Sequence, residues 1–160
     1  MTDRSYTARF TVDQSPAQAY AAINDVRGWW SESIDGGTSR VGEKFKYHYE
    51  DLHRCEIQVR EQIPNRRVVW HVLDNYFSFT EDRSEWKGTD IVFEIARKGE
   101  QTEIIFTHRG LVPEYECYDA CSDGWGTYIN GSLRALIATG KGHPNVGEAL
   151  TKSEVRLAAR

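Results

Sequence analysis

The sequence has little of several features that identify particular classes of protein. Three cysteines, four prolines and one methionine occur among its 160 residues. Its apolar runs are too short to cross a bilayer, so no membrane insertion is expected. Basic residues number 20 and acidic residues 24, and the net charge of −4 favours neither nucleic acid nor an anionic membrane surface as a partner. Residues 1–4 lack the apolar core of a signal peptide, which favours a cytoplasmic location.

The cysteines do not suit a disulfide framework. Cys55, Cys117 and Cys121 are an odd number, and reduced thiols are expected in a cytoplasmic protein. Cys117 and Cys121 stand four apart on a predicted helix and could supply two ligands to one metal ion. Zinc needs three or four ligands, and no second Cys or His pair has matching spacing. We therefore expect neither a metal nor a cofactor.

Aromatic residues, in contrast, are abundant. The chain has five Trp, eight Tyr and six Phe residues, and 39% of all residues are apolar. This composition suffices for one packed core, and the length is typical of a single domain. We place that domain at residues 1–145 and expect a tail or a short helix at 146–160. Large rings fill cores, and they also line cavities that hold apolar ligands.

Alternating apolar and polar residues predict about six strands, whose short connections favour antiparallel pairing. The segments are residues 4–12, 44–50, 55–63, 67–73, 89–97 and 101–109. The polar segment 31–43 and the irregular segment 76–88 are predicted to be loops. Glu61 interrupts the alternation of its strand. A buried carboxylate there could act as an acid or base, but we favour a local bulge or an edge position that puts Glu61 in water.

Two short helical segments follow the first predicted strand. Ser15 and Gln18 match a capping box, with Pro16 at the first helical position. This pattern predicts a helix that runs through Ile23. A second helical turn is predicted to end near Trp30.

The longest helix is predicted near the C-terminus, at roughly 114–139. Its apolar stripe consists of Cys121, Trp125, Ile129, Leu133 and Leu136, and Gly140 is a suitable stop. Only this helix is large enough to cover the concave face of a curved sheet. The predicted fold is therefore α+β, with a curved antiparallel sheet of about six strands wrapped around a long C-terminal helix and two short helices after the first strand.

Several short motifs carry a family resemblance. They are Ser15-Pro16 with residues 19–23, Trp29-Trp30, residues 61–64 with 67–70, the strand from Thr102 to Gly110 after Gly99, and Gly124-Trp125 with Leu133 and Gly140. They span residues 5–144, and their order resembles the START-like (SRPBCC) superfamily, in particular the bacterial relatives of the Aha-type activator of heat-shock-protein-90 ATPase. The resemblance implies the helix-grip fold and a cavity between the sheet and the long helix. It implies no single reaction, because the superfamily includes ligand binders, cyclases and co-chaperone domains.

We therefore expect the protein to bind a hydrophobic small molecule in that cavity. The candidate lining residues are Trp30, Tyr47, Tyr49, Trp70, His71, Phe93, His108, Cys121, Trp125 and Ile129. The alternative is an Aha-like interaction module whose partner is a chaperone or another protein. A cavity enzyme, such as a cyclase or hydrolase, ranks last because the sequence has no compact catalytic constellation. His71 and His108 are expected to be hydrogen-bonded histidines of the core or cavity, although a base or a metal ligand is conceivable.

Overall fold

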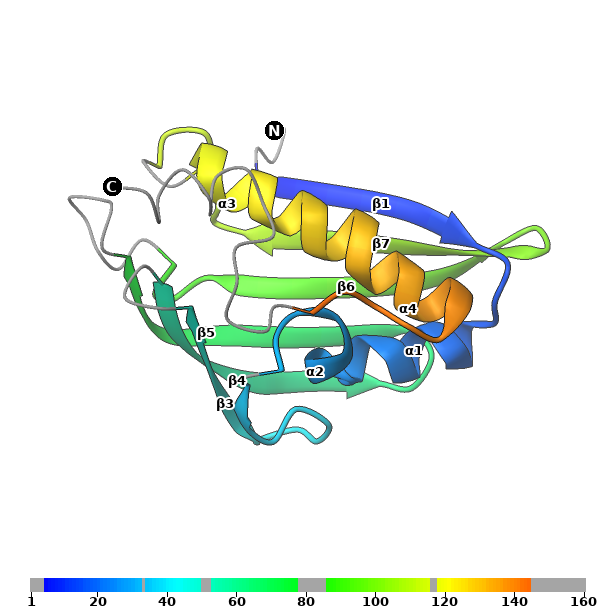
Figure 1. The fold of residues 1–160 in the computed structure, drawn as a ribbon, viewed down its shortest axis with the longest axis horizontal. Helices are drawn as coiled ribbons and strands as arrows, with labels where there is room; N and C mark the ends of the chain where they lie inside the picture. Colours follow the sequence, from blue (N-terminus) through cyan, green and yellow to red (C-terminus); the bar gives the residue numbers. More distant parts are fainter. Residues whose placement is uncertain (1–4, 33, 50–52, 78–85, 116–117, 145–160) are drawn as a thin grey trace.

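Within the described residues, seven antiparallel strands form one curved sheet (Figure 1). The computed structural model describes residues 5–32, 34–49, 53–77, 86–115 and 118–144. The strands are β1 Tyr6–Val12, β2 Asp35–Gly36, β3 Lys44–Tyr49, β4 His53–Ile63, β5 Arg67–Phe77, β6 Asp90–Lys98 and β7 Gln101–Arg109. Their order across the sheet is β1-β7-β6-β5-β4-β3-β2, so the first strand pairs with the last.

The helices cover the concave face of the sheet (Figure 1). Two short helices follow β1, namely α1 Pro16–Asn24 and α2 Val26–Trp29. The C-terminal helix runs from residue 118 to residue 139 in three consecutive parts, α3 Tyr118–Trp125, η1 Gly126–Leu133 and α4 Arg134–Thr139. It lies across the sheet as the yellow-to-orange ribbon of Figure 1. The predicted α+β fold, with a long C-terminal helix against a curved antiparallel sheet, is confirmed.

Local sequence explains where α1 begins and where the C-terminal helix ends. At the start of α1 the Ser15 hydroxyl accepts a hydrogen bond from the Gln18 backbone N–H at 3.2 Å. The Gln18 side-chain oxygen accepts one from the Ser15 backbone N–H at 3.0 Å, which completes the predicted capping box. The C-terminal helix ends at Gly140, whose φ of 85° is a left-handed conformation that favours glycine.

The number of strands differs slightly from the expected six because β2 lies inside the segment predicted as a loop. Asp35 and Gly36 pair with Lys46 and Phe45 of β3. Gly36 has a φ of 113°, and a Cβ there would collide with the Lys44 carbonyl oxygen. The strand is only two residues long and both are exposed, so it has no alternation by which a strand is recognised.

Two register shifts change which side chains point inward. Between β4 and β5 the pairing passes from Glu56 with Asp74 to Ile57 with Val72, so Leu73 has no partner. Beyond this bulge the buried positions of β5 change from even to odd numbers, and the strand continues to Phe77 instead of ending at residue 73. A pattern of period two cannot follow a strand through such a shift.

The second shift confirms the bulge expected at Glu61. Val59 pairs with Trp70 and Glu61 pairs with Val69, so Arg60 has no partner. The Glu61 carboxylate lies outside the core and is 3.3 Å from the Arg67 side-chain Nε. The same shift turns Ile63 outward, where its side chain is exposed.

The C-terminal helix differs from the predicted one in its start and its central turns. It begins at Tyr118 rather than near residue 114, and η1 has π-helical hydrogen bonds. A stripe of buried residues advances in steps of four through Cys121, Trp125, Ile129, Leu133 and Ile137, and Tyr128 and Ser132 beside it are also buried. In an α-helix each step of four rotates the stripe by about 40°. The wider π-helical turn reduces this drift and places Ile137, rather than the predicted Leu136, at the end of the stripe.

Gly124 and Gly131 weaken the C-terminal helix without serving a packing role. A Cβ at either position meets no atom within 4 Å, and neither has a positive φ. We therefore expect Gly124→Ala and Gly131→Ala each to raise the free energy of unfolding by about 0.5–1 kcal/mol in urea denaturation. Gly99→Ala is the control, and it should be destabilising because Gly99 has a φ of 66°. A loss of stability in both helix variants would contradict the assignment.

Candidate functional site

Most of the residues predicted to line a cavity lie together on the inner face of the sheet and helix. Those that the structure buries are Trp30, Tyr47, Trp70, Phe93, His108, Cys121, Trp125 and Ile129. Trp30 directly follows α2, and the others come from four strands and from the C-terminal helix, so segments far apart in the sequence meet in one core.

Two predicted lining residues do not belong to this group. His71 alternates with buried Trp70 and Val72, and its ring therefore lies on the outer face of β5. There the His71 Nδ1 atom is 2.7 Å from an Asp90 carboxylate oxygen. The prediction that His71 lines the interior is wrong because successive side chains of a strand point to opposite faces. The Tyr49 side chain lies outside the described residues, as do Cys117 and the segment 146–160.

Indole rings fill the middle of the interior. Trp29 and Trp70 stack with ring centroids 6.1 Å apart and planes 7° apart, and Trp30 stacks on Tyr47 at 4.4 Å. Phe93 meets Trp70 edge-on at 4.9 Å. Each of these residues is at most 3% exposed. The centre is thus a packed aromatic core, and Trp70 and Phe93 contact other rings there.

Trp125 connects this core to a second aromatic group nearer the N-terminal end of the C-terminal helix. Its ring centroid is 5.1 Å from that of Trp30 and 5.5 Å from that of Trp86, on which it stacks with planes 10° apart. Trp86 in turn meets His53 and His108 edge-on, at 4.6 and 4.7 Å. We call Trp86, Trp125, His53 and His108 the histidine–tryptophan cluster.

His108 is fully hydrogen-bonded within this cluster. The Trp125 indole N–H donates to its Nδ1 at 3.1 Å. An indole nitrogen can only donate, so Nδ1 must be the unprotonated nitrogen and Nε2 must carry the proton. Nε2–H then donates to the Thr89 hydroxyl at 2.8 Å, and that hydroxyl donates to the Trp86 carbonyl oxygen at 2.5 Å. The expected role of a hydrogen-bonded core histidine therefore holds for His108, which has no ring nitrogen left for a ligand.

Burial keeps both histidines of the cluster neutral. Desolvation, together with a smaller effect of the neighbouring His53, lowers the pKa of His108 to about 3. Desolvation also lowers the pKa of His53 to about 3. His53 as a residue is partly exposed, although its Nε2 atom is buried, so its preference for the neutral form is weaker than that of the fully buried His108.

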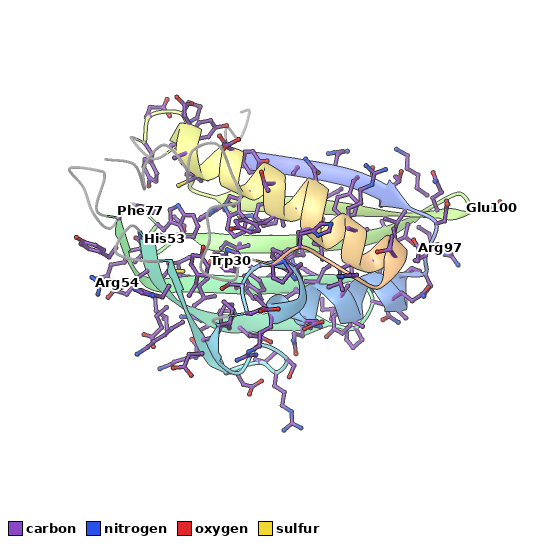
Figure 2. All side chains as sticks on the ribbon, viewed as in Figure 1. Trp30, His53, Arg54, Phe77, Arg97 and Glu100 are labelled. Carbon is purple, nitrogen blue, oxygen red and sulfur yellow. The ribbon has the colours of Figure 1, made fainter. Side chains whose placement is uncertain are left out.

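Three neighbouring residues carry buried nitrogen atoms without a hydrogen-bond partner among the described residues. The atoms are His53 Nε2, Asn75 Nδ2 and Trp86 Nε1. The Asn75 side-chain oxygen accepts a bond from the Trp86 backbone N–H at 2.9 Å, and the His53 and Trp86 rings are in contact. His53 pairs with Phe77 across β4 and β5, at the end of the sheet where Figure 2 shows both side chains. These atoms form the most distinctive polar feature of the described interior.

Sequence analysis missed all three of these residues. His53 has the same phase as Cys55, Ile57 and Val59, so extending that alternation backward by one step would have placed it inward. Asn75 follows the bulge at Leu73, which no periodic pattern detects. Trp86 stands in an irregular segment, and only its tertiary contacts place it in the core.

A depression of about 590 Å³ lies over β3, β4 and β5, and the buried residues Tyr47, Cys55 and Asn75 are part of its lining. The exposed side chains around it include Lys46, His48, Arg54 and Asp74. The Arg54 guanidinium lies 4.5 Å from the centre of the Tyr76 ring, and Figure 2 shows Arg54 directed away from the helices. Its charges of both signs are exposed to water, so this depression is a weaker candidate than the buried cluster.

A family model described as Activator of Hsp90 ATPase homolog 1-like protein matches residues 13–138. The chain belongs to this family. The matched range extends from the end of β1 into α4 and therefore includes the inner face and the histidine–tryptophan cluster. The resemblance to the START-like superfamily and its Aha-type relatives is confirmed. No curated protein matches the chain.

Solved structures support the same family fold. The solution structure of the Aha1 dimer from Colwellia psychrerythraea is 26% identical, with a TM-score of 0.69, and the match covers 89% of this chain and 100% of that one. A protein from Rhizobium loti is 18% identical, with a TM-score of 0.61 and coverage of 79% and 92%. DynU16, from the dynemicin biosynthetic locus, is 15% identical, with a TM-score of 0.62 and coverage of 88% and 49%. The last two show the fold alone.

The remaining observations concern metal ligands, membrane-spanning helices and the cysteines. Among the described residues, no group of three or more His, Cys, Asp or Glu side chains is placed to hold a metal ion. None of the described helices is long and apolar enough to cross a membrane. Cys55 and Cys121 are free and buried, and burial raises the pKa of the Cys55 thiol.

The first prediction from this site concerns Thr89. We expect Thr89→Val to lower the free energy of unfolding by about 1–3 kcal/mol, because it leaves the His108 Nε2–H without an acceptor, while the Trp86 carbonyl oxygen keeps its bond from the Thr89 backbone N–H. Thr89→Ser keeps the hydroxyl and serves as the matched control. Urea denaturation of both variants measures the difference. Equal stabilities of the two would show that the hydroxyl does not support the cluster.

The second prediction concerns pH. Between pH 6.5 and 3 the unfolded chain binds a proton at His108 that the folded chain excludes, so stability is complete above pH 6.5 and falls as the pH falls. We expect a loss of about 2 kcal/mol from His108 between pH 7 and pH 5, with a smaller loss from His53. Urea denaturation at pH 5, 6 and 7 measures it. His53→Leu should retain the larger part of the pH dependence, and its complete disappearance in that variant would contradict the assignment.

Proposed function

We propose that the protein binds a mostly apolar small molecule at the inner face of the sheet, beside the histidine–tryptophan cluster. The family fold supports this proposal, since a START-like domain holds ligands between its sheet and its C-terminal helix. The cluster offers a position for such a ligand at the end of the sheet where His53 and Phe77 lie (Figure 2). The packed rings around Trp70 form a supporting core behind it.

The observation that carries the proposal is the set of buried nitrogen atoms without partners. The Asn75 and Trp86 residues are 6% and 3% exposed, and each leaves an N–H donor without an acceptor among the described residues. A buried polar group without a partner costs about 1–3 kcal/mol of stability. Folded proteins rarely keep several such groups together unless something else satisfies them. A ligand that bonds to these atoms supplies the missing interactions.

The affinity expected for such a ligand is moderate. Burying about 200 Å² of apolar ligand surface at about 25 cal/mol per Å² contributes roughly 5 kcal/mol before the entropic cost of binding. One or two hydrogen bonds to the free donors add about 1 kcal/mol each. Dissociation constants in the micromolar range are therefore the realistic limit for a small molecule.

The experiment is a titration against a panel of fatty acids, flavonoids and aromatic metabolites. Intrinsic tryptophan fluorescence reports binding because Trp86 and Trp125 stack on one another in the cluster. Backbone amide chemical shifts then locate the bound molecule, which should perturb residues near His53, Asn75 and Trp86. Perturbations confined to exposed residues such as Lys46, Arg54 and Asp74, with none at His53 or Trp86, would contradict the proposed position.

A pair of histidine variants distinguishes binding at the inner face of the sheet from binding at its outer face. We expect His53→Leu to weaken binding of a panel member at least threefold and to raise the stability of the protein alone by about 1 kcal/mol, because it removes an unpartnered nitrogen. His71→Leu is the matched control on the outer face and should leave binding unchanged. A destabilised His53→Leu protein that binds normally would show that the imidazole serves only packing.

Absence of binding supports a different function. If no panel member binds below about 1 mM, the interior serves as a packed core and the family description favours a protein-interaction module. That result would overturn the ligand-binding proposal. The outer surface would then become the region to test with chaperone partners.

A further inference from the structure

We propose, on the basis of the proposed function, that the ligand is an uncharged molecule that presents hydrogen-bond acceptor oxygens to the Asn75 and Trp86 side chains. Ketones, esters and related carbonyl compounds with an aromatic body belong to this class. Ionised fatty acids and amines do not belong to it. Two independent observations, the charge of the interior and its balance of donors and acceptors, carry the inference.

The described interior contains no ionised side chain. Its buried polar residues are Ser31, Thr38, Asn75, Thr89, Thr102, His108 and Ser132, and no described Asp, Glu, Lys or Arg residue is buried. An ion that leaves water for such an environment loses its hydration without gaining a countercharge. A charged ligand group placed beside Asn75 and Trp86 would therefore be strongly disfavoured.

Among the described residues, the charged side chains of β4 and β5 near the cluster lie on the opposite face of the sheet. Arg54 and Asp74 are exposed, and the Arg54 guanidinium lies over the Tyr76 ring. Asp90 is within 2.7 Å of His71, which is also on the outer face. None of these groups is placed to neutralise an ion on the inner face, because strand alternation directs them outward.

The unused polar atoms of Asn75 and Trp86 are donors. The orientation of the Asn75 amide follows from its oxygen, which accepts a hydrogen bond from the Trp86 backbone N–H, so its free atom is the NH₂ nitrogen. The Trp86 indole nitrogen can only donate. His53 Nε2 is the third unpartnered nitrogen of this group and can take either role in the neutral ring, while Trp70 Nε1 in the packed core is a further unpartnered donor. A complementary ligand must therefore bring acceptors.

The experiment compares three compounds that share one aromatic body: naphthalene, methyl 2-naphthoate and 2-naphthoate. Their dissociation constants are measured at pH 7.5 by tryptophan fluorescence and by amide chemical shifts. We expect methyl 2-naphthoate to bind at least tenfold more tightly than 2-naphthoate and at least tenfold more tightly than naphthalene. Tenfold corresponds to 1.4 kcal/mol, which is within reach of two hydrogen bonds to buried donors.

A matched pair of tryptophan variants tests the donor. Trp86→Phe removes the free indole N–H and should reduce the preference for methyl 2-naphthoate over naphthalene at least threefold. Trp29→Phe removes an indole N–H that already donates to the Ile23 carbonyl oxygen at 3.1 Å, and it should leave that preference unchanged. Circular dichroism and urea denaturation show whether each variant folds.

The outcomes distinguish this inference from the function on which it rests. If none of the three compounds binds below 1 mM, and the wider panel also fails to bind, the proposed function itself is wrong. If the compounds bind and 2-naphthoate is equal to or tighter than its ester, the inference about charge is wrong while the binding function stands. Equal binding of naphthalene and the ester would overturn the inference about acceptors.

Discussion

The buried imidazole of His108 joins the C-terminal helix to the sheet. Its ring lies on β7, accepts a hydrogen bond from the Trp125 indole of the helix, and donates to Thr89, which donates to the Trp86 carbonyl. Each donor in this series of hydrogen bonds has one acceptor, so the tautomer of the His108 ring follows from the geometry. The arrangement requires a neutral imidazole, because a proton on Nδ1 would displace the Trp125 bond. Burial keeps the His108 ring neutral, and the neutral ring is the form that the hydrogen bonds of the cluster require.

Next to this satisfied chain stands a polar group whose bonds are incomplete. Asn75 uses its oxygen to hold the Trp86 backbone, yet its nitrogen and the Trp86 indole nitrogen have no partner among the described residues. His108 lies in the same aromatic surroundings as Asn75 and Trp86, but the hydrogen bonds of its ring are complete and theirs are not. A core built for stability alone would be expected to pair these donors. The imbalance therefore connects the packing of this domain to a binding role.

Sequence patterns predicted the elements well where one periodicity persists. The steps of four from Cys121 to Leu133 identified the C-terminal helix, and the capping box at Ser15 identified the start of α1. Patterns were less successful where the period changes. The bulge at Leu73 reversed the inward phase of β5 and brought Asn75 into the core, while His71, next to Trp70, pointed outward. A residue type such as histidine carries no information about which face it occupies until the phase of its strand is known.

The sequence by itself determined the fold class, the family and most of the aromatic core, because those depend on local periodicity and on motifs distributed along the chain. Only the tertiary structure decided which buried polar atoms have hydrogen-bond partners. More than twenty positions separate His53 from Asn75 in the sequence, and eleven separate Asn75 from Trp86. Hydrogen-bond completeness depends on distances between such residues. Those distances arise from sheet register and helix docking, which a one-dimensional pattern does not contain.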